Sequence, residues 1–198
     1  KTGLVRDINT QVKRILKVAT DYGFDDNLWH NYLTFFLMMS ENPFSMTCEK
    51  VGASEGSVNA LVENDFRIFK ELFDYDFGPI ERDLGINCFS QISNYKAIHK
   101  KDLMYNKNVS EKVRSLSKKL EAAKDEKEFF DAVTGFYKDY GVGMFGLNKA
   151  FRIDDTPQGS FTFRAINNMD TVMLDDLVGY EIQKKKLVDF GQKMLKKK

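Results

Sequence analysis

Apolar side chains recur at helical spacing along most of the first 140 residues. In residues 4–22 they stand three or four positions apart, which predicts an amphipathic helix that ends at Gly23. Residues 25–39 are apolar on nearly every side. We therefore expect a helix at the centre of the core, begun by Asp25 or Asp26, whose carboxylate can accept hydrogen bonds from first-turn amides.

The same spacing predicts three more helices. One covers residues 57–73, and another begins at Ser110 as its capping residue. A third follows directly: Asp125 with Glu128 three residues later is a capping box, and Gly141 ends the apolar pattern.

The remaining segments follow different patterns. Residues 41–55 and 87–108 are polar and irregular, so we expect loops there. Residues 150–153 and 160–164 alternate apolar and polar side chains around a turn, which predicts a β-hairpin. An isolated hairpin is marginally stable in water, so it must pack on other protein. A lysine-rich helix is expected from about Tyr180.

These elements predict a mainly α fold of the α+β type. We expect a helical amino-terminal domain over residues 1–145, a glycine-rich turn and hairpin linker over 146–170, and a separate segment over 171–198. The chain opens at Lys1 without methionine and stops within a helical pattern. We interpret it as a piece of a longer protein.

Composition narrows the class of protein. The chain has 198 residues and a net charge of +1, which gives no global basic field for a nucleic-acid backbone. Cys48 and Cys88 are too few for a disulfide framework, and their surroundings lack the spacing of metal ligands. No apolar run approaches the roughly 20 residues of a membrane span. We expect a cytoplasmic protein without a membrane segment or a bound metal.

The run from Gly141 to Gly146 matches the spacing of a nucleotide-binding glycine motif. A phosphate loop, however, needs Lys and then Ser or Thr after its last glycine, where this chain has Leu147 and Asn148. The run also follows a predicted helix, whereas such motifs follow a strand. We therefore interpret it as a helix stop and a turn.

The segment from Leu174 to Glu181, continuing to Leu187, resembles the opening of an AAA+ ATPase module. In that family an aromatic or aliphatic residue, two aspartates, two aliphatic residues, a glycine and a glutamate lead into the first helix; this chain has Leu174 where phenylalanine is commoner. Residues 41–45, 64–69 and 146–152 also resemble an uncharacterised group of bacterial AAA+-type ATPases with a helical amino-terminal region of unassigned role.

The resemblance implies that Leu177, Val178 and Gly179 would line the adenine side of a nucleotide pocket in the longer protein, which would use ATP and magnesium. This chain stops before the phosphate loop, so we expect no bound cofactor and no catalysis in it, since phosphate contacts dominate nucleotide positioning.

We expect the helical region to recruit a protein partner or substrate of unknown identity for the ATPase. Candidates for an exposed partner surface are Phe44, Met46, Phe89 and Tyr95, which fall in the predicted loops. Homo-oligomers would form through the ATPase core that lies beyond this chain. Neither a membrane nor a nucleic acid is an expected partner.

Two alternatives belong to other classes. A small enzyme could use Cys88 with His99, or the carboxylates around residues 74–83; His30 lies in an apolar helix and is expected to be a core or boundary histidine and not a base. A nucleic-acid binder could use the hairpin, with Phe161 and Phe163 as stacking groups beside Arg164, and the lysine-rich tail.

Overall fold

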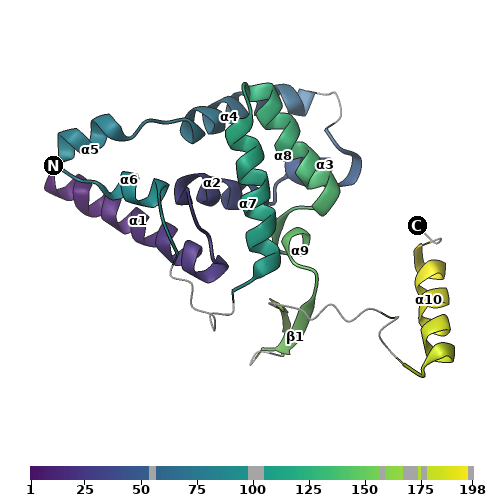
Figure 1. Cartoon of the computed structure of the whole chain (residues 1–198). Helices are drawn as coiled ribbons and strands as arrows, with labels where there is room; N and C mark the ends of the chain where they lie inside the picture. The colour runs from purple at the N-terminus through teal and green to yellow at the C-terminus, as the bar shows by residue number, and fades with distance from the viewer. Residues whose placement is uncertain (54–56, 98–104, 157–158, 167–173, 175–177, 196–198) are drawn as a thin grey trace. The chain divides into compact units, whose positions relative to one another are not determined.

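The computed structural model describes residues 1–53, 57–97, 105–156, 159–166, 174 and 178–195. It divides into two compact units, residues 1–168 and 169–198. The first unit contains α1 (Thr2–Tyr22), α2 (Leu28–Met39), α3 (Pro43–Val51), α4 (Ser57–Phe73), α5 (Gly78–Leu84), α6 (Cys88–Ser93), α7 (Lys107–Ala122), α8 (Glu126–Tyr140), α9 (Gly143–Leu147), β1 (Phe151–Asp155) and β2 (Phe161–Ala165) (Figure 1). The second contains α10 (Glu181–Leu195). The predicted fold class, mainly helical with one hairpin, is confirmed.

Helix α2 forms the centre of the first unit, as predicted. It contacts α1, α4, α6, α7 and α9, and both Leu28 and Met38 are fully buried. Phe36 is the exception on this apolar helix, because its ring is about half exposed. The helix therefore keeps one narrow face at the surface while the rest supports the core.

Two helices begin at residues other than those predicted. The side chain of Asn27 caps α2 by accepting from the amide of His30, whereas Asp26 has a left-handed backbone with φ of 63° and belongs to the preceding turn. Asn106 caps α7 in the same way, four residues before Ser110, the expected cap. Ser110 lies inside α7, where its hydroxyl donates to a carbonyl of the α1–α2 connection.

Two of the predicted loops contain helices. Within residues 41–55 the structure has α3, which begins with a reciprocal capping box between Asn42 and Ser45. The proline that opens α3 suits a first helical position, where its missing N–H costs no hydrogen bond. Within residues 87–108 it has α6; residues 98–104 lie outside the described part of the chain.

Aromatic rings join α3, α4 and α8. Phe44 of α3 meets Phe66 of α4 with ring centroids 5.8 Å apart, and Phe66 meets Phe130 of α8 at 4.9 Å. Phe73 and Phe129 extend the contact between α4 and α8 at 5.6 Å. These edge-on rings add specific geometry to the apolar burial that stabilises the unit.

The predicted ends of α1 and α8 are confirmed. Gly23 and Gly141 follow these helices with φ of 65° and 83°, values that a glycine adopts without a Cβ penalty. Asp125 caps α8 by accepting from the amide of Glu128 at 2.8 Å. The second hydrogen bond of the capping box differs from the usual form. The Glu128 carboxylate accepts from the amide of Lys124 and not from that of the capping residue, Asp125.

The predicted hairpin is confirmed and belongs to the first unit. Strands β1 and β2 are antiparallel, with Ile153 opposite Phe163 at the centre. The hairpin packs on α9 through Phe145, whose ring lies 4.8 Å from that of Phe151. It is therefore anchored on the helical part, and the boundary between the units lies after the hairpin, at residues 168 and 169.

Candidate partner-binding groove

The glycine-rich run forms the end of α8 and most of α9. The amide of Val142 donates to Glu49 at 3.1 Å, and a Cβ on Gly143 would lie 1.9 Å from a carboxylate oxygen of Glu41. Carboxylates of the chain itself therefore stand where a phosphate loop would hold an anion. A helix precedes the run, as predicted, but the run continues into a short helix and not a plain turn.

The four aromatic and methionine residues expected at the surface differ in how far they are exposed. Phe44 is only 8% exposed and packs in the core, so its prediction as a partner contact is wrong. Met46 on α3 is exposed. Phe89 is half-buried and stacks on Phe77 at 4.2 Å, and Tyr95 is half-buried in a backbone bridge with Asp26.

The candidate catalytic groups that the structure describes are half-buried or hydrogen-bonded to neighbouring backbone. Cys88 is half-buried, and this burial raises the pKa of its thiol, which disfavours the thiolate that a nucleophile needs. His99 lies outside the described residues. Glu81 accepts from the backbone and hydroxyl of Ser90, and these hydrogen bonds lower its carboxyl pKa. Asp76 accepts from the amide that opens α5.

His30 is half-buried, as expected for a core or boundary histidine. Its ring stacks on that of Phe73 at 4.0 Å, and its Nε2 lies 2.8 Å from the Phe73 carbonyl oxygen. Nδ1 has no hydrogen-bond partner among the described residues and stands 3.9 Å from a carboxylate oxygen of Glu121. Burial lowers the imidazole pKa.

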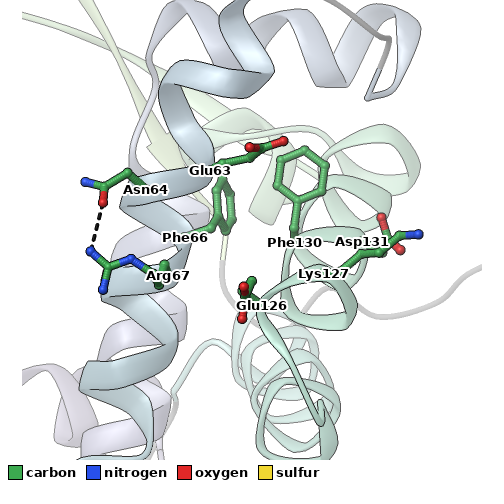
Figure 2. A pocket seen from close by; sticks show the side chains of 8 residues that line it. All are labelled: Glu63, Asn64, Phe66, Arg67, Glu126, Lys127, Phe130 and Asp131. Atoms are coloured by element: carbon green, nitrogen blue, oxygen red, sulfur yellow. Dashed lines mark hydrogen bonds between the residues drawn. The ribbon is translucent and has the colours of Figure 1, made fainter.

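A groove of about 600 Å³ runs between α4 and α8, and the sequence alone gave no sign of it. Figure 2 shows its lining side chains, with Phe66 from α4 and Phe130 from α8 facing each other. Their rings meet edge-on at an angle of 75° and form the apolar floor. The two helices are far apart in sequence, so only the tertiary fold creates this site.

The charged side chains around this floor are mostly acidic. The guanidinium of Arg67 is already bound by Asn64, at 2.8 Å, and by a carboxylate of the same helix (Figure 2). The other charged groups that line the groove are the carboxylates of Glu63, Glu126 and Asp131 and the ammonium group of Lys127. The rim thus carries three negative charges against one positive charge, besides the paired arginine.

The residues that the AAA+ resemblance assigns to an adenine pocket belong to the second unit. Leu177 lies outside the described residues. Val178 is 89% exposed, and Gly179 has a left-handed φ of 90° with open space around its α-carbon. Both lie in the turn before α10, which begins at Glu181, one residue after the predicted start.

Comparison with models of protein families, with curated proteins and with solved structures finds no match to this chain. Among the described residues, no helix has both the length and the apolar character that a membrane span requires.

Proposed function

We propose that this chain is the partner-recruiting amino-terminal region of a bacterial, cytoplasmic AAA+-type ATPase and has no catalytic activity of its own. The observation that carries the proposal is the α4–α8 groove, an apolar floor with a charged rim on a helical unit. Such a surface binds a polypeptide segment through one buried anchor and selects it through flanking charges.

The resemblance of residues 174–187 to the opening of an AAA+ module supports the ATPase part of the proposal. ATP and magnesium would bind in the module that follows, with Leu177, Val178 and Gly179 at its adenine side. Hydrolysis would then act on whatever the helical unit holds, and oligomers would form through that module.

The groove chemistry defines the class of partner. An apolar side chain can cover the half-buried ring of Phe130, which packs on the buried ring of Phe66 at the base of the groove. The excess of carboxylates favours a cationic flank on the bound segment and disfavours an acidic one. We therefore propose a polypeptide segment that presents an aliphatic or aromatic residue beside lysine or arginine.

Fluorescence anisotropy with short labelled peptides tests the groove. A peptide with a Leu-Phe pair flanked by lysines should bind at least about tenfold more tightly than one with glutamates in the flanks, a difference of about 1.4 kcal/mol. The variants Glu63→Lys and Glu126→Lys should each weaken the lysine peptide about three- to tenfold, because each reverses a rim charge.

The matched control is Asp65→Lys, an equal charge change at an exposed position of α4 that does not line the groove. It should leave the affinity within about twofold, because screened charges outside the contact contribute little. Equal binding of both peptides, or an equal effect of all three variants, would refute the groove as the recruiting site.

A second experiment tests the ATPase part independently. The gene should encode G-x-x-x-x-G-K-[ST] within about 10–40 codons after Lys198, and titration of ATP into this chain should release no heat of binding. Nucleotide turnover by the purified chain, or a gene that ends at this lysine, would contradict the proposal.

A further inference from the structure

One face of the hairpin is apolar and open to solvent. Because side chains alternate along a strand, Phe151 and Ile153 of β1 share a face with Phe161 and Phe163 of β2. Ile153 and Phe161 are 63% and 65% exposed, and Phe163 is 38% exposed. Phe145 of α9, 56% exposed, extends the same surface. We call these five residues the hairpin face.

Ring contacts make the hairpin face one continuous patch. Phe163 lies 5.4 Å from Phe145, 5.7 Å from Phe161 and 6.3 Å from Phe151, as measured between ring centroids. The rings therefore hold one another in place. No other described residue of the first unit buries the exposed parts of Ile153, Phe161 and Phe145. A preformed aromatic patch costs little conformational entropy when it is buried in an interface.

We infer that the hairpin face is a self-association surface that packs against the hairpin face of a second copy of this chain. The exposed parts of its side chains offer roughly 500 Å² of apolar surface, at the upper end of what a monomer usually leaves uncovered. Two copies would cover roughly 1,000 Å², the lower limit for a specific interface. This inference does not depend on the α4–α8 groove.

The charges at the two ends of β1 favour a second copy as the occupant. Asp155 ends the strand on the same face, and Lys149 stands in the bend just before β1, two positions from Phe151 at the opposite end; both are exposed. In a two-fold contact with the β1 strands antiparallel, Lys149 of each copy meets Asp155 of the other. The surface is thus complementary to itself in charge as well as apolar in its centre.

The opposite face of the hairpin argues against a nucleic acid as the occupant. Arg152 and Arg164 alternate away from the exposed rings, and Arg164 forms an ion pair with Asp154 at 2.5 Å. A strand that stacks bases needs cations beside its rings to bind the backbone. Here both arginines of the strands lie on the opposite side of the sheet from the rings.

Sedimentation velocity of the whole chain from about 1 to 200 µM tests the inference, since an interface of this size gives a weak dimer. The double variant Ile153→Thr/Phe161→Thr should raise the dimer dissociation constant at least about tenfold, because it removes the most exposed apolar groups while keeping strand-forming residues. Arg152→Thr, the same replacement on the other face, should change it by less than about twofold.

Charge exchange gives a second test that does not disturb the core. Lys149→Asp and Asp155→Lys should each weaken the dimer about three- to tenfold, and the double variant should restore it, because the opposite charges meet again. A chain that is monomeric at every concentration overturns the inference. A charge-exchange double variant that dimerises no more tightly than the two single variants also overturns it. The same holds if a labelled oligothymidine binds the wild type but not Ile153→Thr/Phe161→Thr while the chain remains a monomer.

Discussion

The same substitution, glycine to alanine, should have opposite effects at two helical positions of the first unit. A Cβ added to Gly135 in α8 meets no atom within 4 Å. A Cβ added to Gly146 in α9 would lie 2.3 Å from the carbonyl carbon of Gly141 and 2.6 Å from its oxygen. Both obstructing atoms are backbone, so no side-chain rotation can relieve the contact.

The magnitudes follow from these distances. Alanine at an exposed helical position is favoured over glycine by about 0.8–1 kcal/mol, so Gly135→Ala should stabilise the chain by about that amount. Gly146→Ala has the same gain in propensity, but α9 must move away from the end of α8, and such overpacking costs about 1–3 kcal/mol. Because the contacts of 2.3 and 2.6 Å are severe, we take the upper part of that range, about 2–3 kcal/mol, which gives a net loss of about 1–2 kcal/mol for Gly146→Ala and a difference of about 2–3 kcal/mol between the variants.

Equilibrium urea unfolding, followed by circular dichroism, measures both free energies of unfolding. The slopes with denaturant should agree between the variants, since the area exposed on unfolding is the same. If Gly146→Ala were as stable as Gly135→Ala, the close approach of α9 to the end of α8 would be wrong. The packing role that we assign to the glycine run, in place of phosphate binding, would then lose its main support.

Three further predictions concern polar groups that are buried or half-buried. Tyr137→Phe should lower the free energy of unfolding by about 1 kcal/mol in the same urea assay, because the buried hydroxyl donates to the carbonyl of Leu37 at 2.9 Å; no loss would contradict that bond. Stability should fall as pH drops below about 6.5, because burial lowers the pKa of His30 in the folded state and the unfolded chain then binds more protons. His30→Gln should flatten this pH dependence, and an unchanged slope would assign it to other groups. Lys112→Met should cost about 1–2 kcal/mol in thermal unfolding, because its ammonium group donates to two carbonyls of α9, at 2.8 and 3.2 Å; an unaltered melting temperature would show that this tether is not needed.

Local sequence signals predicted much of the fold. The apolar stripes of α1, α4, α7 and α8 are long and periodic, and Gly23 and Gly141 mark chain reversals that few other residues tolerate. Helix starts were harder to predict, because several residues near each start can cap. Asp25, Asp26 and Asn27 all carry suitable side chains, and only the backbone of the turn after Gly23 makes Asn27 the cap of α2.

The candidate surfaces could not be predicted in this way, because exposure depends on which elements meet. The hairpin face is partly predictable from the sequence. Alternation places Phe161 and Phe163 together, but nothing local indicates that Phe145 joins them. The α4–α8 groove is even harder to predict from the sequence. Its floor pairs Phe66 with Phe130, residues whose contact is set by helix packing and not by either helix alone.

One missed helix explains the error at Phe44. In a loop, a phenylalanine after a proline is a reasonable candidate for an exposed partner contact. Because residues 43–51 form α3, the side chain instead points into the unit, where its ring meets those of Phe66 and Phe130 at 5.8 and 5.9 Å. Phe44 thus supports the floor of the groove from beneath. A residue predicted to contact a partner directly contributes to partner binding, in the proposed function, by holding in place the rings that do.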